Sequence, residues 1–165
     1  MNFLQEEFNF DAPRSLTWKS QWKVVPVGME AALPTYPIDT PEACARYWQE
    51  QVATSWSHDP EVEWVVVITL NTRLFPKGHQ VIAQGTVNET TLHPREVFRA
   101  AIAASGYCVV LMHNHPSGDP SPSAADRNMT RRLREAGQLL RIELLDHVII
   151  GSDQPFSFRE AGLLC

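Results

Sequence analysis

Residues 107–126 read YCVVLMHNHPSGDPSPSAAD, a stretch in which an apolar run, a proline-rich loop and a helix-start pattern follow one another. The apolar run predicts a buried strand over 107–112. Prolines recur between positions 116 and 122, so the loop loses little conformational entropy when it becomes ordered. The helix that begins at Ser123 should carry Asp126 in its first turn. The stretch therefore predicts a strand joined to a helix by a rigid loop, with polar side chains gathered where the strand ends.

His113 and His115 lie at the end of this predicted strand and are spaced i, i+2. In an extended chain alternate side chains point to the same side, so both imidazoles should share one side and Asn114 the other. Two neutral imidazoles on one side provide half of a zinc site, and the carboxylate of Asp126 could provide a third ligand. Such a set leaves a fourth position open for water, which is typical of catalytic rather than structural zinc.

Each of these residues also has a purely structural interpretation. Ser123 and Asp126 fit the [ST]-x-x-[DE] pattern of a capping box, in which Asp126 would only accept a hydrogen bond from the start of the helix. A single histidine at a strand end is more often an ordinary polar side chain than a ligand. The coincidence of two same-side histidines, a rigid loop and a fixed carboxylate favours metal binding, although both interpretations of Asp126 remain open at this point.

A water activated by zinc needs a proton acceptor, and a carboxylate is the usual choice. Glu61 and Glu63 precede the β-branched run Trp64–Ile68, and their i, i+2 spacing would let them share a face. A glutamate at the start of a buried strand is more often a solvated strand end than a base. The residues alone leave open whether either glutamate takes part.

The remaining elements follow from hydrophobic periodicity and from helix-start signals such as Thr40 before Pro41. In chain order we predict a helix over 40–54, a strand over 64–68, a neighbouring strand over 79–87, a helix over 95–104, a strand over 107–112, a helix over 123–140 and a strand over 142–150. Helices interleaved with strands indicate an α/β (α+β) fold in which helices flank a sheet. Residues 1–37 are expected to form an N-terminal arm with a candidate edge strand at 22–28, and residues 38–165 the domain proper.

Composition excludes several classes of protein. The chain has 165 residues, 44% of them hydrophobic, and a net charge of −5, which predicts a single soluble domain and disfavours a surface devoted to nucleic acid. No apolar stretch approaches ~18 residues, so we expect neither a membrane span nor a secretory signal. Cys44, Cys108 and Cys165 are far apart and odd in number, which argues against a disulfide framework and favours the reducing cytoplasm.

Basic residues are concentrated after the loop, at Arg127, Arg131, Arg132, Arg134 and Arg141. One interpretation is a patch that binds phosphate or an acidic partner, as in a DNA-associated accessory protein with a structural metal. The other is a solvated helix face in which Arg131 and Glu135 form an i, i+4 pair. We favour the solvated face, because no aromatic residues are interleaved for base stacking.

The segment from His113 to Asp126 resembles the JAMM (MPN/JAB) metallohydrolase motif, His-x-His-Pro, six residues, Ser, two residues, Asp, without a gap. GTVNETTLHPRE at 85–96, LLDHVIIG at 144–151 and SFREAGLL at 157–164 are similar to the RadC-like branch of that family. The resemblance covers about residues 38–165. The helix-hairpin-helix DNA-binding segment usual upstream in full-length RadC-like proteins has no counterpart in residues 1–37, which weakens a DNA role.

The resemblance implies a mixed sheet of the JAMM/MPN (cytidine deaminase-like) type and a zinc metallopeptidase. It implies that His113, His115 and Asp126 hold Zn2+. Glu63 matches the family's upstream glutamate and would act as general base, whereas Glu61 fits the spacing less well. Ser123 matches the motif serine, which would orient the water or stabilise the oxyanion.

The family's characterised members hydrolyse amide bonds, so the resemblance implies a protein or peptide substrate, with a ubiquitin-like tail as one candidate. The RadC-like branch has no substrate settled by its motif, and a catalytically silent partner-binding module is a further alternative. His93 and His147 are interpreted as structural residues or as residues that support the site. The sequence gives no indication of the oligomeric state.

Overall fold

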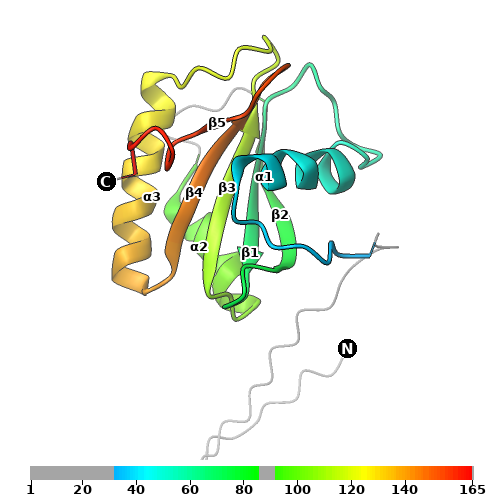
Figure 1. Cartoon of the computed structure of the whole chain (residues 1–165). Coiled ribbons are helices and arrows are strands. Elements are labelled where there is room, and N and C mark those ends of the chain that lie inside the picture. The colour runs from blue at the N-terminus through cyan, green and yellow to red at the C-terminus, as the bar shows by residue number, and fades with distance from the viewer. Residues whose placement is uncertain (1–31, 86–91, 165) are drawn as a thin grey trace, which may run out of the picture.

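Strand β1 (Trp64–Leu70) is buried along its whole length and lies inside a five-stranded sheet. The strand order is β2-β1-β3-β4-β5, in which β3 and β4 run parallel and the other neighbours antiparallel. The computed structural model describes residues 32–85 and 92–164 (Figure 1). Its other elements are α1 (Pro41–Tyr47), η1 (Trp48–Val52), β2 (Pro76–Gln84), α2 (Pro94–Ala103), β3 (Cys108–Asn114), α3 (Ala124–Leu140), β4 (Glu143–Ile150) and β5 (Phe156–Ser157). A mixed sheet flanked by helices confirms the predicted fold class.

The structure departs from the predicted elements in a few places. The first helix changes to a π-helical turn at Trp48, and this wider turn brings Trp48 and Val52 into the core. Strand β5 was not predicted, because two residues carry no recognisable strand pattern. The candidate edge strand at 22–28 and the end of the strand predicted over 79–87 lie outside the described residues.

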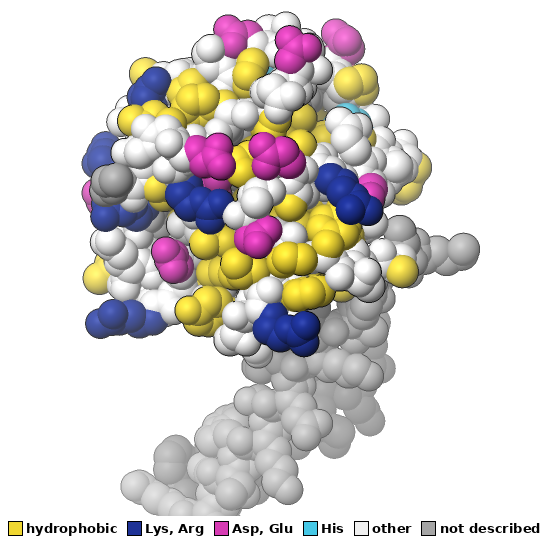
Figure 2. Space-filling view, viewed as in Figure 1, with side chains coloured by type: hydrophobic (Ala, Val, Ile, Leu, Met, Phe, Trp, Pro, Cys, Tyr) yellow, Lys and Arg dark blue, Asp and Glu magenta, His cyan; other side chains and the backbone are white. Residues whose placement is uncertain are grey.

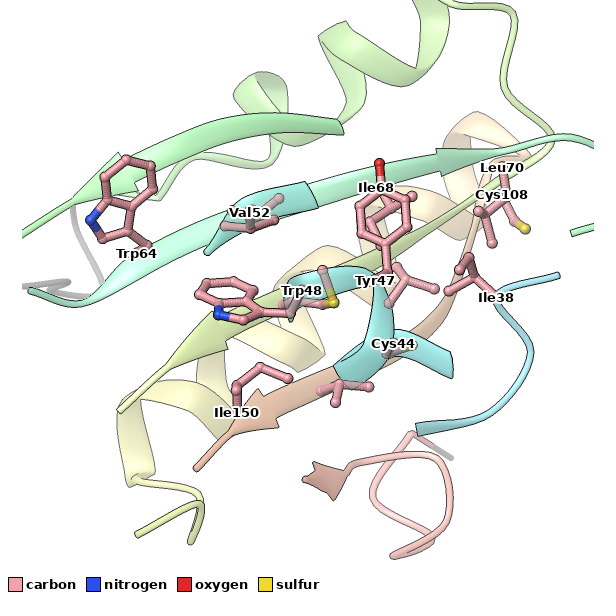
Figure 3. Packing of buried hydrophobic residues seen from close by; sticks show 14 residues of the cluster. Ile38, Cys44, Tyr47, Trp48, Val52, Trp64, Ile68, Leu70, Cys108 and Ile150 are labelled. Carbon is pink, nitrogen blue, oxygen red and sulfur yellow. The ribbon is translucent and has the colours of Figure 1, made fainter. Parts of the chain in front are cut away.

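Helices cover both faces of the sheet: α1 lies on one face, and α2 and α3 lie on the other (Figure 1). Figure 3 shows the packing on the α1 face, where Tyr47 lies beside Ile68 of β1, and where Trp48 and Trp64 belong to the same apolar cluster. On the opposite face, Phe98 of α2 belongs to a second apolar cluster that also includes residues of α3. Both faces of the central strands are therefore buried under helices, which explains why the sequences of these strands are continuously apolar.

Strand parity decides which polar side chains face α3. Odd-numbered residues of β1 and β3 pack in the cluster on the α2 and α3 side, and even-numbered residues pack on the α1 side. Because side chains alternate along a strand, His113 points toward α3 and Asn114 away from it. Glu63 immediately precedes β1 and has the same parity as the residues that face α3.

Strand β4 reverses its parity part of the way along. A register shift interrupts its pairing with β3, between the partners of Val109 and Val110. Before the shift Leu144 packs on the α3 side, and after it Val148 packs on the α1 side. A one-residue bulge exchanges the two faces of a strand. As a result His147 is on the α3 side, next to His113.

The surface is mixed in character. On the face shown in Figure 2, lysine and arginine side chains are spread out and lie among aspartate and glutamate. Within residues 32–85 and 92–164, no helix has the length and apolar character needed to cross a bilayer.

Candidate metal centre

Four side chains from three parts of the chain meet where β3 ends and α3 begins. One ligand atom from each of Glu63, His113, His115 and Asp126 lies within 4.8 Å of the other three. The Nε2 atom of His113 is 3.0 Å from Nε2 of His115 and 3.2 Å from Oδ1 of Asp126. It is 3.9 Å from Oε1 of Glu63. The structure therefore brings together His113, His115 and Asp126, the three residues that the sequence suggests as metal ligands. It also places the carboxylate of Glu63 beside them.

These separations suit a small metal ion. Ligands held at ~2.0–2.1 Å in a tetrahedron lie roughly 3.3 Å from one another. The separations of 3.0 and 3.2 Å from His113, together with 3.7 Å between Nε2 of His115 and Oδ2 of Asp126, lie on both sides of that value. Nitrogen and carboxylate oxygen are donors that zinc accepts. The residues present thus fit a metal ion, and the cluster could hold one.

His115 is held by the loop that follows it. Its Nδ1 lies 2.7 Å from the main-chain oxygen of Asp119, which can only accept, so Nδ1 carries the proton and donates it. With that proton on Nδ1, Nε2 is the ring nitrogen that faces the cluster and can offer a lone pair to a metal ion. Gly118 gives the loop its turn, with φ of +81°, and packs against Ser152. The proline-rich loop after His115 therefore orients the ring of His115, and the loop itself provides no side chain to the cluster.

Asp126 serves the helix and the cluster at the same time. Its Oδ2 accepts hydrogen bonds from the backbone N–H and the hydroxyl of Ser123, at 2.8 and 2.6 Å, which completes a capping box. Its Oδ1 faces His113 at 3.2 Å. The two interpretations of Asp126 are therefore compatible.

Ser123 caps α3, and its hydroxyl is engaged with Asp126 in both directions. In this arrangement it steadies the carboxylate. A role in orienting water or stabilising an oxyanion stays a prediction.

Glu63 is positioned through its backbone. Its carbonyl oxygen accepts a hydrogen bond from Gly85 at 2.9 Å. Asn114 bonds the residues on either side: its Oδ1 accepts from the N–H of Trp64 at 2.8 Å, and its Nδ2 donates to the carbonyl of Val62 at 3.0 Å. The sequence placed Asn114 on the side away from the histidines but assigned it no role. Only the fold shows that this side contacts the glutamate segment.

Glu61 does not join the cluster. It is exposed, and its backbone N–H donates to Asp59 in a local turn. The side chain of Glu63 is 24% exposed, so it borders both the cluster and solvent.

Behind the cluster lies the fully buried His147. Its Nε2 is 2.8 Å from Nδ1 of His113, and its Nδ1 is 2.7 Å from Oγ1 of Thr130. Burial lowers the pKa of His147 well below its usual value, which favours the neutral form of the ring. His93, by contrast, is the N-cap of α2, where its ring accepts from the N–H of Arg95.

The arginine-rich segment divides into two parts. Arg131 pairs with Glu135 at 3.7 Å, as the solvated-face interpretation predicts. Arg134 and Arg141 line an open cleft of about 580 Å³ near the C-terminal end of α3, together with Arg159. The cluster lies at the opposite end of that helix, so the cleft is a separate feature.

Fold and cluster together define an α+β domain with a candidate metal centre at the end of its central strands. The chain belongs to the RadC-like JAB domain family, whose model matches residues 38–163. A UPF0758 protein of Chlorobaculum parvum is 47% identical over 106 residues, which cover 64% of this chain and 48% of the relative. A UPF0758 protein of Thermotoga maritima is 44% identical over 127 residues, which cover 77% of this chain and 54% of the relative. The chain thus spans about half the length of these curated relatives.

Proposed function

We propose that this protein is a zinc-dependent hydrolase that cleaves an amide bond, as a peptidase or isopeptidase. The observation that carries the proposal is the convergence of Glu63, His113, His115 and Asp126 within 4.8 Å. A capping residue alone would explain Asp126, and a strand end alone would explain Glu63. Neither explains why both carboxylates meet the same pair of imidazoles.

His113, His115 and Asp126 would hold the metal ion, and Glu63 would stand beside it. When bound, zinc lowers the pKa of a coordinated water toward ~7 and polarises a substrate carbonyl. The ligand side chains are held rigidly: His113 is fully buried, and Asp126 is fixed by its hydrogen bonds from Ser123. Such support preserves a reactive geometry between turnovers.

Glu63 would act as general base and then as general acid. Its carboxylate would take a proton from the attacking water and deliver it to the leaving amine, a type of transfer typically worth ~10²–10⁴ in rate. Partial exposure suits this role, because the 24% exposed side chain of Glu63 can meet a substrate. The side chain of His115 is 18% exposed and marks the same open side. We expect a protein or peptide chain to approach from there.

The proposal is tested by Glu63→Gln, which keeps the shape of the side chain and removes its basicity. The variant should retain its zinc and lose ~10²–10⁴ in kcat against peptide and isopeptide libraries. Glu61→Gln is the matched control, because Glu61 lies two residues earlier, is exposed and is outside the cluster. Mass spectrometry of proteins retained by Glu63→Gln would identify the substrate. Equal turnover by Glu63→Gln and the unaltered protein would contradict the proposal, and zinc binding without any turnover would favour a silent binding module.

A further inference from the structure

We propose that Thr130 and His147 are positioning residues that fix the ring proton of His113 on Nδ1, so that the lone pair of Nε2 faces the metal centre. This inference rests on the proposed function, because it concerns the same site. It assigns a role to two buried residues that lie behind the cluster and do not join it.

Three hydrogen bonds link the main-chain oxygen of Asp126, Thr130, His147 and His113, and Thr130 decides which atom donates in each. Its hydroxyl lies 2.6 Å from the main-chain oxygen of Asp126, and a carbonyl oxygen can only accept. The hydroxyl has one proton, which it donates there. Toward Nδ1 of His147, at 2.7 Å, it must therefore accept, and the proton of that bond belongs to His147.

The position of the proton on His147 then decides the position of the proton on His113. A neutral imidazole has one N–H, so His147, protonated on Nδ1, has a bare Nε2. That nitrogen lies 2.8 Å from Nδ1 of His113 and can only accept, which puts the proton of His113 on Nδ1. His113 therefore directs the lone pair of Nε2 at the cluster.

The consequence is a site lined by acceptors alone. Nε2 of His115 also has a lone pair, because Nδ1 of that ring donates to Asp119. The two imidazole nitrogens, 3.0 Å apart, and the nearby carboxylate oxygens would repel one another without a shared positive charge. The tautomer of His113 thus makes the cluster ready for a cation.

Packing keeps this arrangement in place. His147 is fully buried and stacks on Phe158, with ring centroids 4.6 Å apart and planes 8° from parallel. Thr130 follows Asp126 by one helical turn on α3. The same helix therefore carries both the carboxylate of the cluster and the hydroxyl that orients the ring behind it.

The test compares Thr130→Val, which removes the hydroxyl but keeps the shape, with Thr130→Ser, which restores it. Thr130→Val leaves Nδ1 of His147 facing a methyl group, so the preferred tautomer reverses and the proton of His113 moves to Nε2. We expect zinc affinity, measured by competition with a chromogenic chelator, to fall ~10–100-fold in Thr130→Val and to recover in Thr130→Ser. Thr69→Val is the control for the same chemical change at a buried threonine near the other end of the sheet.

A second readout needs no metal. Two-bond 1H–15N correlation spectra of the metal-free protein report which ring nitrogen carries the proton, and we expect Nδ1 for both His113 and His147. A ring of His147 protonated on Nε2 would mean that Thr130 donates to it, and would overturn the inference. Unchanged zinc affinity in Thr130→Val would overturn it as well. If the unaltered protein takes up no zinc, the proposed function fails, and the tautomers alone then decide for or against the inference.

Discussion

Asn114 holds the backbone on both sides of Glu63. Its side-chain oxygen accepts from the N–H of Trp64, and its amide donates to the carbonyl of Val62. Asn114 lies between the two histidines in sequence but points to the opposite face of the sheet. One short segment of β3 therefore orients the imidazoles on one side and the glutamate segment on the other.

Replacing Asn114 should uncouple catalysis from metal binding. Asn114→Ala removes the side-chain partner of the buried N–H of Trp64 and of the partly buried carbonyl of Val62, so the free energy of unfolding should fall by about 1–3 kcal/mol. Turnover should fall further than zinc affinity, because Glu63 loosens while the ligands stay. Denaturant unfolding, zinc titration and kcat measure the three effects.

Asn71→Ala is the matched control, because the Asn71 side chain also makes two hydrogen bonds to the backbone, accepting from the N–H groups of Arg73 and Phe75 at the other end of β1. It should lose stability without losing turnover per bound zinc. Equal loss of turnover in both variants would mean that Asn114 acts through stability alone.

Asp126→Asn separates capping from metal binding. Asparagine keeps an oxygen for the bonds from Ser123, so thermal stability of the metal-free protein should change little. Its amide removes the negative charge that faces His113. Zinc affinity should therefore fall by more than the ~10–100-fold typical of losing a group that only orients a ligand. Calorimetry and zinc titration would show this contrast, and unchanged zinc affinity would restrict Asp126 to its capping role.

Gly151 allows the loop after His115 to pack closely. A Cβ at this position would lie 2.6 Å from the carbonyl oxygen of Gly118 and 2.8 Å from Pro120. Gly151→Ala should therefore displace the loop that holds Asp119 against His115, and lower zinc affinity by about 10-fold. Gly137→Ala, whose Cβ would lie 2.5 Å from the carbonyl oxygen of Ile142, is an equally crowded control at the far end of α3. Zinc titration of both variants should show a loss only in Gly151→Ala.

The buried cysteines should be unreactive in the native protein. Burial raises the pKa of Cys44 to about 12 and that of Cys108 to about 11. At pH 8 the thiolate of Cys44 would be roughly one part in ten thousand, and thiolate is the form that alkylates. Iodoacetamide labelling followed by mass spectrometry should modify both residues slowly until the protein unfolds. Rapid native labelling of Cys108 with loss of hydrolysis would indicate a thiol at the site.

Local patterns predicted much of the fold and of the candidate site. Alternation along an extended chain correctly placed His113 and His115 on one side, and the capping pattern correctly marked the start of α3 at Ser123. These features depend on neighbours in the sequence. Glu63 could not be separated from Glu61 on the residues alone, because the choice depends on the register of β1 against β3.

The roles of His147 and Asn114 could not be predicted from sequence patterns for the same reason. His147 faces α3 only because the bulge in β4 exchanges the faces of that strand. The role of Asn114 depends on contacts with residues fifty and more positions away. Both features arise from tertiary pairing, which no local periodicity encodes.

The metal centre is tested by measuring the zinc content and zinc coordination of the protein, by elemental analysis and X-ray absorption after exposure to zinc. We expect one zinc per chain, with two imidazole nitrogens and carboxylate oxygen among its ligands. His113→Ala with His115→Ala should reduce the bound zinc to background. Protein that takes up no zinc, or as much zinc without these histidines as with them, would contradict a zinc centre at His113, His115 and Asp126.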